Sequence, residues 1–139
     1  ILKRPYVMVG TDAGTQYDKG RPGHPQDAGT YPKFFKQMLR EQNRISLVDA
    51  IDRCTYQVAK RFHIPDKGIL AEGADADLVV FDPEEIEDKA QYPCYGDTDT
   101  RPEGITAVII GGILAVDGKT VKDVKPGRMY RDLLKTWKW

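Results

Sequence analysis

Hydrophobic and polar residues alternate with the spacing of a helix just after residue 30. Thr30 has the form of an N-cap, and Pro32 suits the first turn of a helix, where a missing N–H breaks no hydrogen bond. Apolar residues then recur at helical spacing: Phe34, Phe35, Met38 and Leu39. The pattern predicts a helix from Thr30 to Arg40 that buries one face.

A second helical pattern begins at Ser46, the clearest start signal in the chain. The Ser46 hydroxyl suits an N-cap, and Asp49 stands at the N3 position, where its carboxylate imitates a capping box. One apolar stripe follows, formed by Leu47, Ala50, Ile51, Cys54, Val58 and Phe62. His63-Ile64-Pro65 predicts its end, because the residue before a proline avoids helical geometry.

Beyond Gly68 the chain changes to the shorter apolar runs of β-strands. Strands are predicted in three stretches: Ile69-Leu70, 77–82 and 106–116. Gly111-Gly112 divides the last stretch into a hairpin, because a glycine pair supplies the positive φ of a two-residue turn. Asp117-Gly118 is a second turn signal. The tail from Lys125 to Trp139 carries apolar residues compatible with a short final helix.

A further strand is predicted close to the start of the chain. Tyr6-Val7-Met8-Val9 follows Pro5 and is closed by residues 10–14, which suits a strand buried on both faces. The loop of residues 15–29 is longer than most connections, and such loops are often functional. Because the chain starts at Ile1 and reaches this strand almost at once, we expect further residues upstream.

Composition and charge exclude several classes of partner. The 139 residues suit one ordinary domain, and 21 Lys and Arg balance 21 Asp and Glu. Without a basic tract, no nucleic acid partner is expected. The longest apolar runs, 78–81 and 107–116, are too short to cross a bilayer, so no membrane is expected. Cys54 and Cys94 form neither a CxxC pattern nor a disulfide framework, which predicts a reducing, cytoplasmic location.

Asp12 and His24 are the residues best placed for chemistry. Asp12 follows the predicted buried strand, and the catalytic groups of parallel α/β barrels lie where strands end. The alternative is that Asp12 only caps a turn. His24 lies beside Pro25, whose restricted backbone would present the imidazole to a pocket, but an exposed loop histidine fits the local sequence equally well. His63 is interpreted as a C-terminal helix cap.

Metal ligands are scarce in this sequence. His24 and His63 are the only histidines and are not spaced as paired ligands, so the chain does not build the shell of a hydrolytic metal by itself. Either the other ligands lie elsewhere or there is no metal. The acids of residues 75–82 alternate with strand residues and are interpreted as turn markers rather than as a general acid and base.

Short motifs follow one another along nearly the whole chain. They are 11–14 (TDAG), 24–25 (HP), 29–32 (GTYP), 47–51 (LVDAI), 66–70 (DKGIL), 73–83 (GADADLVVFDP), 104–105 (GI) and 108–112 (VIIGG). From about Tyr6 to Arg128, this order resembles the C-terminal region of the D-aminoacylase family, the N-acyl-D-amino-acid deacylases of the amidohydrolase superfamily. Segment 73–83 is widespread in the superfamily, whereas HP and GTYP point to the deacylases.

The resemblance implies an α/β fold followed by a β region. Residues 1–67 would form the last strand and outer helices of an amidohydrolase TIM barrel. Residues 68–139 would form the C-terminal part of a small β-sandwich and a tail. A last barrel strand without its neighbours and half a sandwich leave edges and apolar faces open. We therefore expect association with a missing N-terminal segment of the same protein or with another copy.

The resemblance also implies a site. Asp12 matches the acid at the end of the last barrel strand, which in the superfamily takes a proton from metal-bound water and delivers it to the leaving nitrogen. Asp12 is therefore expected as a catalytic residue and shared metal ligand, and His24 as a substrate-binding residue. The full-length parent would use zinc. This fragment alone would bind none and be inactive, because the family's other ligand positions lie upstream.

Two departures from the family concern the substrate. Thr11-Asp12-Ala13 replaces the more usual Ser-Asp-Gly, and Gln26 stands where a basic residue usually follows His-Pro. The predicted substrate is a small molecule, a linear amide such as an N-acyl-D-amino acid. The alternatives are a cyclic-amide hydrolase of the dihydroorotase or hydantoinase type, and a non-catalytic binding or structural domain on the same scaffold.

Overall fold

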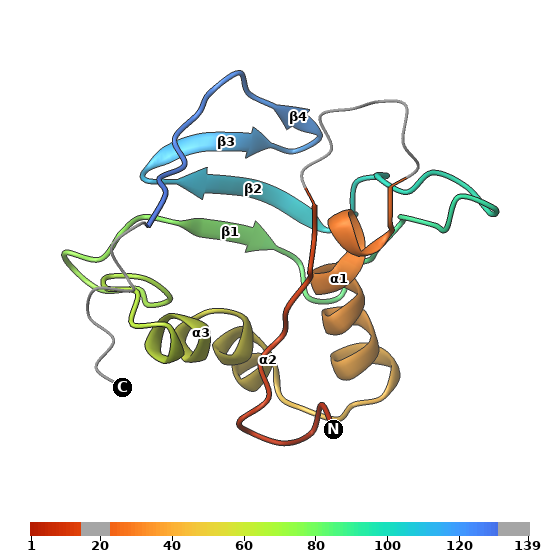
Figure 1. Cartoon of the computed structure of the whole chain (residues 1–139), viewed down its shortest axis with the longest axis horizontal. Helices are drawn as coiled ribbons and strands as arrows, with labels where there is room; N and C mark the ends of the chain where they lie inside the picture. Colours follow the sequence, from red (N-terminus) through yellow and green to blue (C-terminus); the bar gives the residue numbers. More distant parts are fainter. Residues whose placement is uncertain (15–22, 131–139) are drawn as a thin grey trace.

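The computed structural model describes residues 1–14 and 23–130, which form a helical region and a sheet region (Figure 1). The helical region contains α1 (Gln26–Phe35), the π-helical turn η1 (Lys36–Glu41), α2 (Leu47–Cys54) and α3 (Tyr56–Arg61). The sheet region contains β1 (Leu78–Phe81), β2 (Ile105–Ile110), β3 (Ile113–Asp117) and β4 (Thr120–Val121). In Figure 1 the sheet lies above the helices.

The sheet is antiparallel, and its order β1-β2-β3-β4 follows the chain. Ile110 pairs with Ile113 across a turn in which Gly111 and Gly112 have φ of 56° and 80°, so the predicted hairpin is confirmed. The second predicted turn is also confirmed: Gly118, at φ 55°, lies between the paired residues of β3 and β4. β1 and β4 form the two edges of the sheet.

The first helix begins earlier than the sequence predicted. The expected N-cap, Thr30, lies inside α1, and its hydroxyl donates to the carbonyl oxygen of Gln26 at 2.9 Å. Pro32 is likewise inside the helix rather than in its first turn. The prediction placed the start at Thr30 because proline is best tolerated in a first turn. The structure instead extends the helix to Gln26, which places that residue beside the turn of Asp12.

The second predicted helix is divided in two. Ser46 caps α2 as predicted, since its hydroxyl accepts from the Asp49 N–H at 3.1 Å. The Asp49 carboxylate accepts from the Ser46 hydroxyl at 2.8 Å, and not from the backbone as a capping box requires. Thr55, at φ −130° and ψ −88°, interrupts the helix before α3. Within residues 1–14 and 23–130, no helix has the length and apolar character needed to span a bilayer.

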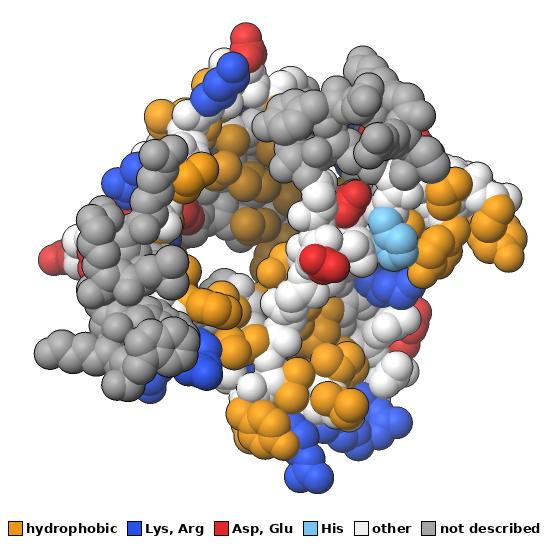
Figure 2. Space-filling model, in the orientation of Figure 1, with side chains coloured by type: hydrophobic (Ala, Val, Ile, Leu, Met, Phe, Trp, Pro, Cys, Tyr) orange, Lys and Arg blue, Asp and Glu red, His pale blue; other side chains and the backbone are white. Residues whose placement is uncertain are grey.

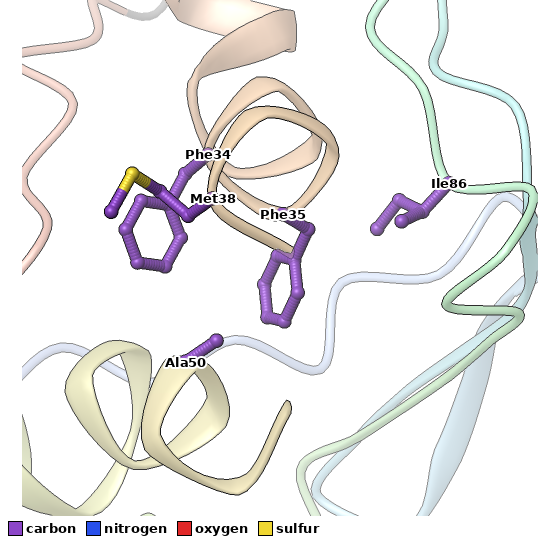
Figure 3. Close-up of a cluster of buried hydrophobic side chains, with 5 residues drawn as sticks. All are labelled: Phe34, Phe35, Met38, Ala50 and Ile86. Atoms are coloured by element: carbon purple, nitrogen blue, oxygen red, sulfur yellow. The ribbon is translucent and has the colours of Figure 1, made fainter. Parts of the chain in front are cut away.

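A buried hydrophobic cluster joins the two regions (Figure 3). Its members are Phe34, Phe35, Met38, Ala50 and Ile86. Phe35 packs edge-on against Phe34, with ring centroids 5.8 Å apart, and against Phe81 of β1 at 5.2 Å. The buried face predicted for the first helix is therefore confirmed, and the sheet region covers part of it. Full burial of one such side chain contributes roughly 1.5–3 kcal/mol.

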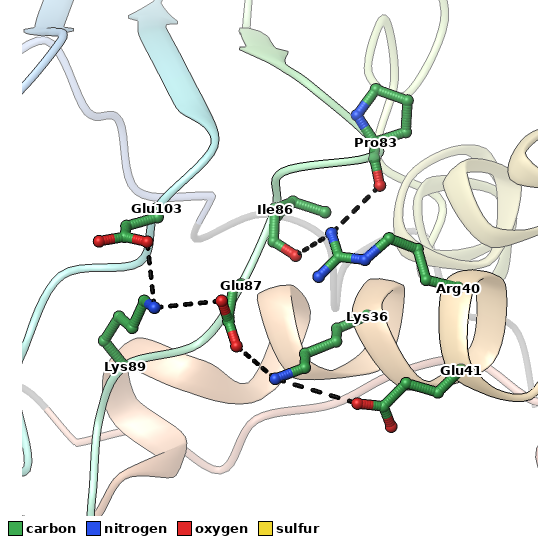
Figure 4. Close-up of polar contacts among 8 residues, drawn as sticks. All are labelled: Lys36, Arg40, Glu41, Pro83, Ile86, Glu87, Lys89 and Glu103. Carbon is green, nitrogen blue, oxygen red and sulfur yellow. Dashed lines mark hydrogen bonds and ion pairs between the residues drawn. The ribbon is translucent and has the colours of Figure 1, made fainter.

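A charged network crosses the same junction (Figure 4). Lys36 of η1 pairs with Glu87, and Lys89 pairs with Glu87 at 3.1 Å and with Glu103 at 3.0 Å. The hydrogen bond from Lys36, followed by that from Lys89, lowers the pKa of Glu87 to about 2 from its usual 4.5. Glu87 is therefore ionised at neutral pH and stands between two lysines, one in the helical region and one in the sheet region.

Two close backbone contacts complete the junction. Arg40 Nη1 donates to the carbonyl oxygens of Ile86 at 2.7 Å and of Pro83 at 3.3 Å. Gly68 has a φ of 76°, and a Cβ at this position would lie 2.8 Å from backbone atoms at the start of α3. A side chain at residue 68 would therefore displace backbone, which explains why glycine occupies it.

Three predicted elements differ in the structure. Tyr6–Val9 forms no strand, because among residues 1–14 and 23–130 no strand pairs with it; Val9 instead packs against the hydrophobic cluster. Ile69-Leu70 is also not a strand, and Leu70 is 85% exposed. Most of the predicted final helix, residues 131–139, lies outside the described residues, and residues 125–130 are not helical.

Hydrophobic side chains remain exposed beside the junction. Figure 2 shows them gathered around a hollow between the sheet and the helices. Val79 and Val80 of β1 are 55% and 50% exposed, and Ile113 of β3 is 48% exposed. The apolar surface of the sheet region is therefore only partly covered by the described residues.

Candidate functional site

The turn that carries Asp12 lies at the end of the first described stretch, residues 1–14. Asp12 is exposed and has a φ of 50°, in the left-handed region that aspartate adopts more often than most non-glycine residues. The Thr11 hydroxyl accepts from the Ala13 N–H at 3.1 Å, which closes the turn locally. Since residues 6–9 form no strand in the described chain, the position of Asp12 depends on contacts made elsewhere.

The first turn of α1 supplies these contacts. The side-chain amide of Gln26 donates to the carbonyl oxygen of Asp12 at 3.0 Å. Asp27 Oδ1 accepts from the Gly14 N–H at 3.2 Å, and its negative charge is favoured by its position in the first turn of the helix. Two consecutive helix residues therefore hold the two ends of the Asp12–Gly14 segment.

His24 lies just before α1 and is joined to Asp12 through Gln26. Its Nδ1 accepts from the Gln26 N–H at 3.2 Å, so the neutral ring carries its proton on Nε2. The ring packs edge-on against Tyr92, with centroids 5.2 Å apart. His24, Tyr92 and Tyr95 help to line a hollow of about 460 Å³, a volume suited to a small ligand.

The described residues do not form a metal centre by themselves. Within 1–14 and 23–130, no three His, Cys, Asp or Glu side chains lie close enough together to hold an ion. These residues therefore do not fit a zinc ion, which needs at least three protein ligands. Burial raises the pKa of the Cys54 thiol to about 12, so the thiol is protonated at neutral pH and behaves as a small apolar side chain beside the hydrophobic cluster.

The acids near the start of β1 have structural partners. Lys67 pairs with Asp75 at 3.0 Å and also with Asp77. Asp77 Oδ1 accepts from the Gly111 N–H at 2.7 Å, which ties the hairpin turn to the residue before β1. The hydrogen bond from Lys67 lowers the pKa of both carboxyl groups, so both are ionised acceptors. These contacts give Asp75 and Asp77 a structural role.

Two further hollows lie along the junction between the helices and the sheet region. Their volumes are about 490 and 530 Å³, and Glu87 lines both. Asp12 lines none of these three hollows, whereas His24 lines the one of about 460 Å³ and neither of the other two. The lysine and glutamate side chains of the Glu87 network already pair with one another there, so the hollow beside His24 is the better candidate for a substrate.

Sequence patterns did not identify all the neighbours of Asp12 and His24. Asp27 had a signal, because an acid two residues after Pro25 is typical of a first helical turn. Tyr92 had none, because its contact with His24 joins segments that lie far apart in the sequence. Gln26 stood out only as a departure from the family motif, which did not indicate that it contacts Asp12.

Comparison with known proteins gives consistent matches along most of the chain. A model described as the amidohydrolase family matches residues 7–114. The N-acyl-D-aspartate deacylase of Alcaligenes xylosoxydans xylosoxydans is 33% identical over 129 residues, 93% of this chain and 25% of that protein. The N-acyl-D-glutamate deacylase of the same organism is 33% identical over 132 residues, 94% of this chain and 25% of that protein. The chain thus spans about a quarter of the length of these relatives.

Solved structures agree with the sequence matches. A D-aminoacylase crystal structure, described as defining a novel subset of amidohydrolases, matches 76% of this chain and 22% of its own with a TM-score of 0.71 and 28% identity. The N-acyl-D-glutamate deacylase of Bordetella bronchiseptica, complexed with zinc and a phosphonate inhibitor, matches 84% of this chain and 24% of its own with a TM-score of 0.73 and 29% identity.

Proposed function

The chain belongs to the amidohydrolase family, and we propose that it is part of a hydrolase that cleaves a linear amide such as an N-acyl-D-amino acid. The observation that carries the proposal is the similarity to deacylases of N-acyl-D-amino acids over more than nine-tenths of this chain. We further propose that the segment alone is inactive, because its described residues hold no metal centre and match only about a quarter of those relatives.

In this proposal Asp12 is the proton-transfer group. Its carboxylate accepts a proton from the attacking water as the water oxygen bonds to the amide carbonyl carbon. The same proton then passes to the amide nitrogen as the C–N bond breaks, which releases the amine. An exposed carboxylate at the end of the N-terminal segment suits this role because the water and the leaving nitrogen need access to it. Zinc does not fit the described residues alone, so Asp12 is proposed to share it with ligands that lie outside them.

We propose that His24 contacts the substrate. Its Nδ1 is occupied by the Gln26 N–H, so the Nε2–H is the donor that it offers to a carbonyl or carboxylate. Tyr92 and Tyr95 line the same hollow and would pack against apolar parts of the substrate.

We also propose the division predicted above, with residues 1–67 completing a barrel and residues 68–139 completing a small β-sandwich. The exposed valines of the edge strand β1 support association with further strands, of the same protein or of another copy. Cys54 and Cys94 are free thiols, which supports a reducing, cytoplasmic location.

The test uses the full-length protein that carries this chain, with Asp12→Asn as the variant. Removing a general base lowers kcat by roughly 10²- to 10⁴-fold. Asp66→Asn is the matched control, because Asp66 is also exposed and also has a positive φ, of 58°. Hydrolysis would be measured on N-acetyl-D-amino acids, their L enantiomers, and a cyclic amide such as a hydantoin, with zinc content measured for each variant.

The proposal is supported if the wild type hydrolyses the D substrates, Asp12→Asn loses this activity at unchanged zinc content, and Asp66→Asn retains it. If the cyclic amide is hydrolysed in preference to the linear amides, the protein is a cyclic-amide hydrolase of the hydantoinase type. A full-length protein that hydrolyses none of these substrates with zinc bound contradicts the proposal and favours a binding or structural role.

A further inference from the structure

We propose that Gln26 is a positioning residue for Asp12, and that the first turn of α1 acts as a clamp on the Asp12–Gly14 turn. The inference rests on the proposed role of Asp12. It assigns to Gln26 a contact with the protein's own backbone, at the position where the family motif usually has a basic residue.

The turn needs a clamp because its own conformation is unfavourable. Asp12 has a φ of 50°, and such residues persist where surrounding contacts hold them. The hydrogen bond between Thr11 and Ala13 is local and would form equally well with the turn displaced as a unit. The contacts from Gln26 to Asp12 and from Asp27 to Gly14 are the described ones that tie the turn to a helix.

Gln26 serves both predicted site residues at once. Its side-chain amide donates to the Asp12 carbonyl at 3.0 Å, and its backbone N–H donates to His24 Nδ1 at 3.2 Å. The backbone bond persists in any variant other than proline, whereas the side-chain bond needs a donor of similar reach. Substitution of Gln26 should therefore release Asp12 while leaving the hydrogen bond to His24 in place.

The side chain of Gln26 is neutral and is engaged with backbone. It is therefore not a counter-ion for an anionic group of the substrate. Gln26 also lines the hollow beside His24, but its amide N–H is directed to Asp12, so its loss should affect the chemical step more than substrate binding. A hydrogen bond of this kind contributes roughly three- to tenfold to an equilibrium between held and displaced turns. We expect kcat to fall by up to that factor, the full factor applying when the displaced turn predominates in the variant, and KM to stay within about twofold.

The experiment compares three variants of the full-length protein. Gln26→Met keeps the length of the side chain and removes the donor, and should lower kcat measurably, by up to roughly tenfold. Gln26→Lys restores a donor of similar reach and should recover most of kcat. Gln42→Met is the matched control, because Gln42 is exposed at the far end of η1, and it should match the wild type.

Hydrogen–deuterium exchange supplies a measurement that does not depend on activity. In Gln26→Met, the amide of Gly14, which donates to Asp27, should exchange faster, while those of α2 and β2 keep their protection. This result in a protein that hydrolyses no amide would support the clamp and contradict only the proposed function.

Three results would overturn the inference. One is unchanged exchange of the Gly14 amide in Gln26→Met. Another is a change confined to KM, which would make Gln26 a substrate contact. The third applies if the wild type is active and Gln26→Met is folded but slow. In that case, failure of Gln26→Lys to recover kcat would contradict the clamp.

Discussion

The helical region and the sheet region are held together in different ways. In the sheet, strands that follow one another in sequence are neighbours in space, and the tight turns of β2–β3 and β3–β4 contain glycines at positive φ. In the helical region, the buried face of α1 and η1 is covered partly by Ile86 and Phe81 of the sheet region. The β2–β4 part of the sheet is therefore specified mainly by local sequence, whereas β1 and the helices depend on contacts between residues far apart in the sequence.

The two regions also differ in what they leave uncovered. In α2, Ala50 is fully buried while Leu47 and Ile51 of the same stripe are more than a third exposed. In β1, the consecutive residues Val79 and Val80 point to opposite faces, and both are half exposed. The helix pair leaves one face partly open, whereas the edge strand leaves two faces and an edge open. Association is therefore expected first at β1.

The largest loss of stability is expected from Phe35→Ala, which removes the aromatic contact between the two regions. Phe35 is 7% exposed, and truncation of a buried Phe costs roughly 3–5 kcal/mol in the free energy of unfolding. Urea unfolding would measure it, with Phe62→Ala as control, because Phe62 is 50% exposed and should cost about 1 kcal/mol. Equal losses would show that the cluster does not join the regions. If Phe35→Ala fails to fold, Phe35→Leu gives the smaller, measurable change.

The next effect concerns the backbone contact at Gly68. In Gly68→Ala, the added Cβ would lie 2.8 Å from backbone at the start of α3, so overpacking of roughly 1–3 kcal/mol adds to about 1 kcal/mol for the positive φ. Gly73→Ala is the matched control, since Gly73 has a φ of 84° and no heavy atom within 4 Å of an added Cβ. Thermal or urea unfolding should show the larger loss for Gly68. Equal losses of stability in the two variants would mean that the backbone at the start of α3 moves away from the new Cβ at no energetic cost.

A smaller and purely local effect is expected from Ser46→Ala. The variant removes the hydroxyl that accepts from the Asp49 N–H, and loss of such an N-cap costs about 1 kcal/mol. Ser46→Thr keeps a hydroxyl and should unfold close to the wild type. Hydrogen exchange should show faster opening of the first turn of α2 and no change in the sheet. Spread of the change into β2 and β3 would show that the helix and the sheet unfold together.

The smallest effect is expected from Glu87→Gln, and it should depend on pH. The pKa of Glu87 is lowered to about 2, so its contribution to stability is present above its usual pKa of 4.5 and is lost as pH falls towards 2. The urea midpoint of the variant should lie below that of the wild type at pH 7, and the two should converge near pH 2. The exposed Glu72→Gln serves as control. A gap that persists at pH 2 would assign the effect to packing rather than charge.

The sequence predicted best where the deciding contacts are short in range. The cap at Ser46, the Gly111-Gly112 hairpin and the turn at Gly118 each depend on residues a few positions apart, and the structure confirms them. The predicted start of α1 was wrong because tertiary contacts, among them those of Gln26 and Asp27, offset the roughly 3 kcal/mol that a proline inside a helix costs. The interruption at Thr55 was missed because the apolar stripe continues through it.

In the candidate site, too, the sequence identified residues by local motifs but not the contacts between distant segments. Asp12 and His24 were identified from their motifs, and their roles as catalytic and substrate-binding residues stay predictions. The bonds from Gln26 to Asp12 and from Asp27 to Gly14 join positions on either side of a long loop, and Tyr92 approaches His24 from the sheet region. None of these pairings has a periodic or motif signal in the sequence.

By itself, the sequence determined the family, the hairpins, the helix cap and the two residues on which the proposed chemistry depends. Only the tertiary structure decided that Gln26 and Asp27 hold the Asp12 turn, that Ile86 and Phe81 cover α1, and that Tyr6–Val9 lies without a paired strand among the described residues. The physical reason is that caps and turns are closed by hydrogen bonds within a few residues, whereas packing, strand pairing and site geometry depend on partners that the chain brings together only when it folds.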